Sequence, residues 1–292
     1  MTPSEPPPLW PAVSRWYAHA ARDLPWRRPG TSPWAVLMSE VMLQQTPVSR
    51  VEPVWEQWAI RWPTPAQLAA EPAGEAVRAW GRLGYPRRAL RLHAAAVTVV
   101  ERHEGRLPLT VAELLALPGV GDYTARAVAA FAHRQRHPVV DSNVRRVVAR
   151  AEEGLADAPV TRRDLGRVLD LLPADGDRAA TTSVALMELG ALVCTARSPQ
   201  CPACPLLDRC AWVRAGRPPL ETPVRRPQGY AGSDRQVRGR LLGVLRDSQE
   251  PVEPDVLAQV WVEPAQRTRA LAGLVADGLV DPLPDGRYAL PR

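Results

Sequence analysis

The chain has 292 residues, 46% of them hydrophobic, and carries a net charge of +6 with an isoelectric point of about 9.7. It has no apolar run of about eighteen residues, and residues 1–13 lack a basic start followed by an apolar stretch, which argues against membrane-spanning and secreted classes. We therefore expect a cytoplasmic protein. The basic balance favours a polyanionic partner, with nucleic acid first. A codon bias toward arginine would give a similar charge, and the chain contains no lysine.

Helices dominate the predicted secondary structure. Apolar residues recur three or four positions apart in segments rich in Ala, Leu and Arg, and proline and glycine separate these segments. No sustained period-two alternation predicts a large sheet, and the Pro-rich start (Pro3, Pro6, Pro7 and Pro8) is expected to be extended or disordered. The segments predicted to be helical are 66–80, 87–102, 111–117, 122–134, 144–152 and 179–193.

A tight turn with the sequence LPGVG joins two of these segments. Pro118 ends the first helix, and Gly119 and Gly121 permit positive φ and leave backbone N–H groups uncovered. Because these groups precede the next helix, where the helix dipole favours an anion, Gly119, Val120 and Gly121 are predicted to bind a DNA phosphate without reading a base. The pattern is typical of a helix-hairpin-helix, and the alternative is an ordinary turn between helices.

All four cysteines of the chain lie within one short segment, at Cys194, Cys201, Cys204 and Cys210. Disulfides are not expected in a cytoplasmic protein. Structural zinc sites commonly contain two close C-x2-C pairs, whereas this spacing has one close pair with a single cysteine further out on each side. Four thiolates suit a [4Fe–4S] cluster, but the spacing alone does not exclude zinc.

The composition changes after the last cysteine. A basic linker rich in Pro and Gly is placed at 225–235. Helices at 236–246, 254–261 and 264–277 follow, and a turn at Asp285-Gly286 precedes a short strand at 287–290. Three helices and a hairpin are the outline of a winged helix, which we expect at 236–292 and which should add phosphate contacts. A small helical cap without a specific role is the alternative.

The hairpin and the cysteine loop together resemble the helix-hairpin-helix DNA glycosylases that carry an iron–sulfur cluster, and most closely the adenine DNA glycosylases. The resemblance covers about residues 9–223 and implies a domain at 1–224 that is all-α and two-lobed, with a DNA-binding cleft and a [4Fe–4S] cluster in the loop 194–210. It implies a monomer that removes adenine opposite 8-oxoguanine or guanine in double-stranded DNA of the nucleoid. The segments that carry it are LPWR (24–27), SEVMLQQT (39–46), GRLGY (81–85), LPGVGDYTA (117–125) and VVDSNVRRV (139–147).

Two carboxylates are the expected catalytic pair. Glu40 lies in an apolar segment, where burial would raise its pKa and keep it protonated. The resemblance implies that this glutamate protonates adenine N7. Asp141 precedes a predicted helix, where as an N-cap it would accept N–H bonds and stay ionised. The resemblance implies that Asp141 stabilises the cationic sugar and that Asn143 positions water or the carboxylates. The alternatives are a glutamate on the surface of a helix and a carboxylate with only a capping role.

Tyr123 sets the expected subclass. The resemblance implies that bifunctional relatives place a lysine here as an amine nucleophile, and this chain has no lysine anywhere to replace it. The protein is therefore expected to be monofunctional.

The resemblance also assigns contacts to DNA. It implies that Gln45 and Tyr85 insert into the duplex, that Leu43 lines the adenine pocket and that Thr46 lies near the opposite base. The remaining expected DNA contacts are Arg27, Gln44 and Arg197.

Two rival functions fit part of the sequence. A thymine or uracil mismatch glycosylase of the same fold could also have tyrosine at position 123, but it would lack the glutamate of SEVMLQQT. A DNA-binding redox-sensing regulator would not need Glu40, Tyr123 and Asp141 together. The resemblance implies that longer members of the family often carry a Nudix-like C-terminal domain that inspects 8-oxoguanine. With a winged-helix pattern in its place, we expect the preference for 8-oxoguanine over guanine to be weaker here.

Overall fold

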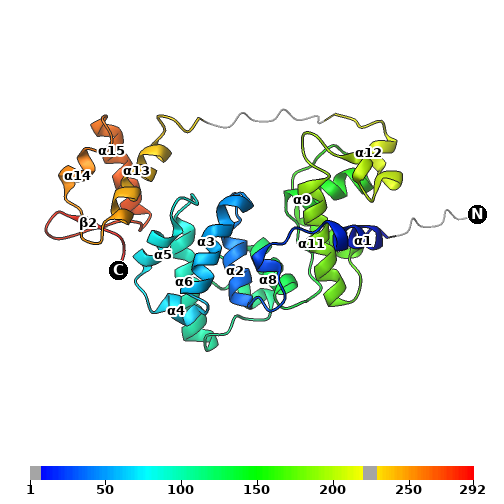
Figure 1. The fold of residues 1–292 in the computed structure, drawn as a ribbon, viewed down its shortest axis with the longest axis horizontal. Coiled ribbons are helices and arrows are strands. Elements are labelled where there is room, and N and C mark those ends of the chain that lie inside the picture. The colour runs from blue at the N-terminus through cyan, green and yellow to red at the C-terminus, as the bar shows by residue number, and fades with distance from the viewer. Residues whose placement is uncertain (1–7, 220–228) are drawn as a thin grey trace, which may run out of the picture. The chain divides into compact units, whose positions relative to one another are not determined.

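The computed structural model describes residues 8–219 and 229–292 and is mostly helical, as expected (Figure 1). Pro3, Pro6 and Pro7 of the expected Pro-rich start and residues 225–228 of the expected linker lie outside the described residues. No helix in the described ranges is long and apolar enough to cross a membrane. The chain divides into two compact units. The first comprises residues 1–36, 109–115 and 121–224, and the second comprises residues 37–108, 116–120 and 225–292.

The first unit packs its core around three helices. Val13 on α1, Val144 on α9 and Leu189 on α11 are fully buried in one apolar cluster. Asp141 and Asp175 cap α9 and α11, since each side chain accepts a hydrogen bond from the backbone N–H three residues ahead. The helices of this unit are α1 (Trp10–Ala20), η1 (Pro25–Arg27), α7 (Val111–Leu115), α8 (Asp122–Phe131), α9 (Ser142–Val148), η2 (Ala149–Glu153), α10 (Arg162–Leu171), α11 (Gly176–Leu192), η3 (Cys201–Ala203), η4 (Leu207–Arg209) and α12 (Ala211–Arg214).

One predicted helix of this unit changes its geometry partway along. The sequence predicts a single helix at 144–152, but α9 ends at Val148 and η2 continues it as one π-helical turn. Such turns are rare and often occur at functional sites. Arg150, which contacts the cysteine loop, lies within this turn.

The second unit has a tryptophan-rich core. The ring of Trp58 meets those of Trp62 and Trp80 edge to face, at centroid distances of 4.6 and 5.6 Å. Its helices are α3 (Val48–Arg61), α4 (Pro65–Ala69), α5 (Ala73–Trp80) and α6 (Arg87–His103), and α2 (Pro33–Met42) passes from the first unit into this one. The helix predicted at 66–80 is two helices, because Pro72 stands between them and cannot continue a helical hydrogen-bond ladder.

The C-terminal part of the chain belongs to the second unit. It contains α13 (Asp234–Asp247), α14 (Pro254–Ala258), α15 (Pro264–Ala276) and an antiparallel hairpin of β1 (Asp281–Pro282) and β2 (Tyr288–Ala289). In the hairpin, Asp281 pairs with Ala289 and Pro282 with Tyr288. Its order of three helices and a hairpin is that of the predicted elements, whereas its identity as a winged helix stays a prediction.

Candidate functional site

A polar network begins at Asp141, the N-cap of α9 in the first unit. One carboxylate oxygen of Asp141 accepts the backbone N–H of Val144 at 2.7 Å, and the other accepts the amide of Asn143 at 2.9 Å. The Oδ1 atom of Asn143 in turn accepts from the guanidinium of Arg146 at 2.8 Å. The carboxylate is therefore held in one orientation by two donors, and the orientation of Asn143 is set by an arginine.

The same arginine reaches the cysteine loop. Arg146 is buried and donates at 2.7 Å to the carbonyl oxygens of both Gly190 and Cys194. A Cβ atom at position 190 would lie 2.7 Å from the Cβ of Asn143, so only glycine lets α11 approach α9 this closely. A continuous path of hydrogen bonds thus connects Asp141 with the backbone of the first cysteine of the loop.

The four cysteines line one pocket in the first unit. None of the four forms a disulfide, and Cys201 and Cys210 are buried against Trp212. Arg150 holds one side of the loop. Its guanidinium lies 3.5 Å from the Sγ of Cys194, donates to the carbonyl of Thr195 at 2.8 Å and stacks over the ring of Trp212. No three His, Cys, Asp or Glu side chains within residues 8–219 and 229–292 converge as they would around a single metal ion.

This donor set fits a metal cluster. Burial raises the pKa of the Cys204 thiol to about 11, and the other three thiols add to the rise. Burial also raises the pKa of Cys194, although Arg150 opposes it. Four thiolates in one pocket therefore need positive charge close to the sulfurs, and iron bound to them would supply it. The cluster would join segments that have little regular structure of their own.

The two glycines of the helix-hairpin-helix turn use different backbone conformations. Gly119 uses the positive φ that its residue type permits, with a φ of 78°, and a Cβ there would lie 2.6 Å from the Cβ of Arg91. Gly121 does not use it: its φ is −95° and its ψ 177°, because it is the extended N-cap of α8. Gly121 is nevertheless exposed and precedes the first helical N–H groups, and Val120 is buried.

The expected catalytic residues are divided between the two units. Glu40 belongs to the second unit and lies on α2, where it is only 6% exposed and its neighbours from Val36 to Met42 are also buried. Tyr123, Asp141 and Asn143 belong to the first unit. Tyr123 lies in the first turn of α8, partly buried against Ala127 and Val139.

Two exposed side chains of the second unit stand on strained backbone. Gln45 has a φ of 55° and Tyr85 a φ of 47°, in the left-handed region that side-chain-bearing residues rarely adopt. Tyr85 is 53% exposed. Backbone strain of this kind persists only where the surroundings enforce it, and both residues were expected to insert into DNA.

Arg88 holds the loops that carry these two residues. Its guanidinium donates to the carbonyls of Val41 at 2.9 Å, Gln44 at 2.6 Å and Gly84 at 3.0 Å. It also donates to the hydroxyl of Thr46 at 2.9 Å. Burial lowers the pKa of Arg88 to about 10, which still leaves it charged at neutral pH. One buried cation thus fixes the segment 41–46 and the turn before Tyr85 against each other.

Some expected DNA contacts have other partners in the structure. Thr46 is buried, and its hydroxyl donates to the carbonyl of Leu83 at 3.2 Å. Arg27 donates at 2.8 Å to Glu188, which also binds Arg22. Although burial alone would raise the pKa of Glu188, these arginines lower it to about 2. Arg197 is exposed, and Leu43 and Gln44 are half-buried.

Three arginines of these networks were not predicted from the sequence. Arg88, Arg146 and Arg150 are each buried and each bind backbone carbonyls of remote segments. Arg146 and Arg150 carried a usable signal, because they stand four residues apart among valines and therefore on one apolar face of a helix. Arg88 had no such signal, because its partners Val41 and Gln44 lie more than forty positions earlier in the chain.

Comparison with known families matches two parts of the chain. The sequence model of the HhH-GPD superfamily of base excision DNA repair proteins matches residues 38–165, which include Glu40, the hairpin and Asp141. The model of the iron-sulfur binding domain of endonuclease III matches residues 194–210, from the first cysteine to the last. The loop is therefore an iron–sulfur site, and the expected [4Fe–4S] cofactor is confirmed.

Purified protein should be brown, with a broad absorbance near about 400 nm and about four irons per chain. Replacing Cys204 with serine should remove the colour, because one of the four ligands is lost, while Ser198→Ala in the same loop should keep it. Metal analysis by plasma emission checks both. A colourless wild-type protein with stoichiometric zinc would contradict the assignment.

Whole-length relatives fix the family. The adenine DNA glycosylase of Mycolicibacterium smegmatis is 60% identical over 276 residues, covering 94% of this chain and 93% of that protein. That of Mycobacterium tuberculosis is 57% identical over 279 residues, covering 94% and 91%. A solved thermostable thymine-DNA glycosylase is 25% identical with a TM-score of 0.65, covering 70% of this chain and 95% of that one. With this identity over nearly the whole length of both sequences, the chain belongs to the adenine DNA glycosylases of the HhH-GPD superfamily.

Proposed function

We propose that this chain is a monofunctional glycosylase that hydrolyses the N-glycosidic bond of adenine mispaired with 8-oxoguanine or guanine. The observation that carries the proposal is the Asp141 carboxylate, whose two oxygens accept from Val144 and Asn143 at 2.7 and 2.9 Å. A carboxylate oriented before the reaction begins can stabilise the positive charge that develops on the deoxyribose as the bond breaks. Because the Asp141 carboxylate is already oriented, little free energy is spent on reorienting it when the bond breaks.

Glu40 acts as the general acid in this proposal. It is 6% exposed on an apolar helix, a setting that suits a carboxylic acid which must deliver a proton. Protonation of adenine at N7 makes the base a better leaving group, and water then adds to the sugar carbon. Asn143, held by Arg146, positions Asp141 and the attacking water.

DNA is held at several places of the second unit and of the hairpin. Gln45 and Tyr85 insert into the duplex beside the mispair, and Leu43 lines the adenine pocket. Gly119, Val120 and Gly121 bind a phosphate, while Arg27, Gln44, Thr46 and Arg197 contribute further contacts. The enzyme works as a monomer on nucleoid DNA in the cytoplasm.

The domain division is part of the proposal. Residues 1–224 form the glycosylase domain, residues 225–235 a linker and residues 236–292 a winged-helix-like domain. A winged helix offers no evident pocket for an oxidised guanine. We therefore expect a weaker preference for 8-oxoguanine over guanine than in longer relatives, one that rests on the segment around Gln45 and Thr46.

Base release from a set of duplexes tests the proposed substrate. Duplexes with A opposite 8-oxoguanine, G or C, and with T or U opposite G, are incubated with excess enzyme, and the strands are then cleaved with alkali. Release of adenine from the first two alone supports the proposal. Release of thymine or uracil as the main activity would contradict it and favour the mismatch glycosylase.

Tyr123→Lys should gain weak strand nicking, because it restores an amine where lyases of this fold use one. Wild-type protein should nick DNA only after alkali or heat. Gel analysis with and without alkali checks both. Tyr17→Lys, on α1, is the control, because it adds a lysine at a different position in the same unit. Trapping of a covalent complex between wild-type protein and DNA by borohydride would contradict the monofunctional assignment.

A further inference from the structure

The turn that presents Tyr85 is held by an unusual number of side chains. We call residues 81–85 the probing turn. Each of its first four carbonyl oxygens accepts a hydrogen bond from a side chain, whereas exposed turns commonly leave such groups to water. The donors are Arg246 to Gly81, Arg50 to Arg82, Thr46 to Leu83, and both Trp80 and Arg88 to Gly84.

Four of these five donors come from helices and loops around the turn itself. The fifth, Arg246, comes from α13, more than 160 positions later in the chain. Its Nε donates to the carbonyl of Val77 at 2.9 Å, and a terminal nitrogen donates to that of Gly81. Because these carbonyls lie at the C-terminal end of α5, the cation also interacts favourably with the helix dipole. Burial lowers the pKa of Arg246 to about 10, which leaves it charged at neutral pH.

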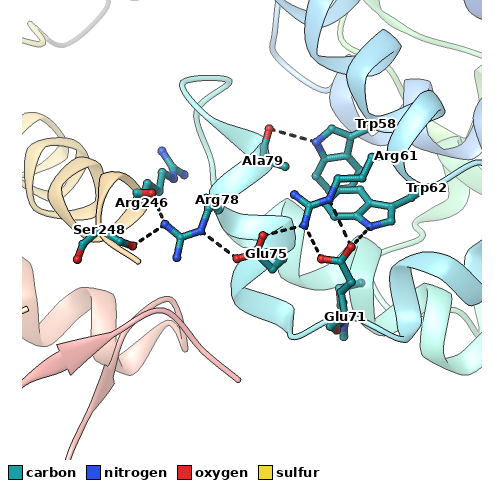
Figure 2. A network of polar contacts seen from close by, with 10 residues as sticks. Trp58, Arg61, Trp62, Glu71, Glu75, Arg78, Ala79, Arg246 and Ser248 are labelled. Atoms are coloured by element: carbon teal, nitrogen blue, oxygen red, sulfur yellow. Dashed lines mark hydrogen bonds and ion pairs between the residues drawn. The ribbon is translucent and has the colours of Figure 1, made fainter. Parts of the chain in front are cut away.

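A second arginine makes the reverse connection (Figure 2). Arg78 on α5 donates to the carbonyl of Ser248 at 2.7 Å and to that of Arg246. Glu75 accepts from Arg78 at 2.9 Å and from Arg61 at 2.8 Å, which anchors Arg78 on the unit. The C-terminal part and α5 thus each contribute an arginine that binds backbone carbonyls of the other.

Two further contacts fix the C-terminal part to the same region. The backbone N–H of Gly74, at the start of α5, donates to the carbonyl of Pro291 at 2.7 Å. Arg87, at the start of α6, forms an ion pair with Asp277 at 3.2 Å. The C-terminal part therefore contacts both ends of α5 and the residue that follows Pro86, on either side of the probing turn in the sequence.

The charge of this part does not favour phosphate binding as its main role. Residues 236–292 contain seven arginines and eight carboxylate side chains, so they lack the positive excess that a phosphate-binding surface requires. Several of these arginines already have carboxylate partners, Arg269 with Asp234 and Arg287 with Asp285 among them. Its best-defined use of arginine is the contact with α5.

We infer that residues 229–292 act as a brace that holds the probing turn, with Arg246 as the positioning residue, and that they thereby set how well the enzyme distinguishes the base opposite adenine. The inference rests on the proposed function for its effect on catalysis, but not for the brace itself. Without the brace, the first carbonyl of the turn loses its partner and Tyr85 is presented less firmly.

Hydrogen–deuterium exchange of the full-length protein tests the brace without reference to activity. Arg246→Met keeps the alkyl stem and removes the donors, so amides of residues 81–85 should exchange about tenfold faster. Arg240→Met is the matched control, because Arg240 lies over the ring of Trp261 within the C-terminal part. It should leave the exchange of residues 81–85 unchanged. Unchanged exchange in Arg246→Met would overturn the inference.

Arg78→Met distinguishes the positioning role of Arg246 from a general weakening of the contact between the C-terminal part and α5. It removes the contacts to Ser248 and Arg246 but keeps the bonds from Arg246 to Val77 and Gly81. Exchange of the probing turn should therefore rise less than in Arg246→Met, and Arg246→Lys, which retains one donor, should partly restore protection. Equal increases in Arg78→Met and Arg246→Met would overturn the assignment of Arg246.

Single-turnover rates test the consequence for specificity. The ratio of adenine release opposite 8-oxoguanine to that opposite guanine should fall severalfold in Arg246→Met. It should not fall further when Arg246→Met is added to Tyr85→Leu, since coupled residues give non-additive effects. Additive effects would overturn the link to Tyr85. If the wild type released no adenine at all, the proposed function would fail, while the exchange measurement would still decide whether the brace exists.

Discussion

Replacing Glu40 with glutamine will lower the single-turnover rate of adenine release by about 10²–10⁴-fold, the usual contribution of a general acid. Glutamine has almost the same shape, so the packing of α2 around position 40 should be kept. Its amide has no acidic proton to transfer to the base. Binding to a duplex with A opposite 8-oxoguanine should stay near that of the wild type, because a neutral group replaces one that the proposal holds neutral.

Two companion variants sharpen this result. Glu56→Gln makes the same substitution at an exposed position on α3 of the same unit and should leave the rate unchanged. Glu40→Asp keeps an acid but shortens its reach, so part of the activity should remain. Thermal unfolding of all three proteins shows whether the fold is intact. Near-normal turnover by a well-folded Glu40→Gln protein would remove Glu40 from the mechanism.

Local sequence rules predicted the helices of this protein well, because the apolar periodicity that indicates a helix lies within the helix itself. The segment expected at 87–102 is α6, Arg87–His103, and the one expected at 264–277 is α15, Pro264–Ala276. The main error, one helix at 66–80 in place of α4 and α5, also has a local cause. Pro72 lies inside that segment, and its missing N–H interrupts a helix even where the apolar periodicity continues.

Sequence motifs named candidate site residues, but they did not indicate which side chains hold those residues in place. Asp141 and Asn143 follow from a family motif, and the capping role of Asp141 follows from the position before a helix. Arginine, however, was interpreted from the sequence as net charge for a nucleic acid. In the structure Arg88, Arg146 and Arg246 bind backbone carbonyls from distant segments. Which arginines are buried in this way depends on tertiary packing, for which a single sequence contains no spacing rule.

Thr46 and Gly121 illustrate the same limit at smaller scale. Motif position places Thr46 in the segment expected near the opposite base, but it does not show that the hydroxyl bonds to Leu83 and Arg88. The residue type of Gly121 permits positive φ, yet the residue is an extended N-cap, a position where glycine is also favoured. A residue type shows which conformations and contacts are permitted, and the neighbouring segments decide which one is used.

Asp141→Asn should reduce adenine release at least about 10²-fold, because one preorganised charge opposite the developing sugar cation is lost. The hydrogen-bond network makes the substitution more disruptive than its size suggests. Asparagine can still cap α9 through its oxygen and accept the N–H of Val144. Its other terminal atom becomes an amide nitrogen, a donor only, placed 2.9 Å from the amide nitrogen of Asn143.

Asn143 cannot relieve that conflict by turning over. Its Oδ1 accepts from Arg146 at 2.8 Å, so a flipped amide would place its nitrogen against a guanidinium, again donor against donor. Because Arg146 is also bonded to the carbonyls of Gly190 and Cys194, it is not free to move away. The direction of each hydrogen bond in the network is therefore fixed, and only a hydrogen-bond acceptor at position 141 satisfies the amide of Asn143.

A matched control separates this effect from helix capping. Asp175→Asn makes the same change at the N-cap of α11, where the side chain accepts only the N–H of Arg178, at 2.9 Å, and it should leave activity unchanged. The iron absorbance of both variants must equal that of the wild type, so that loss of the cluster cannot account for loss of rate. If Asp141→Asn kept near-normal turnover, Asp141 would be a cap and nothing more, and the cationic sugar would have to be stabilised by another group.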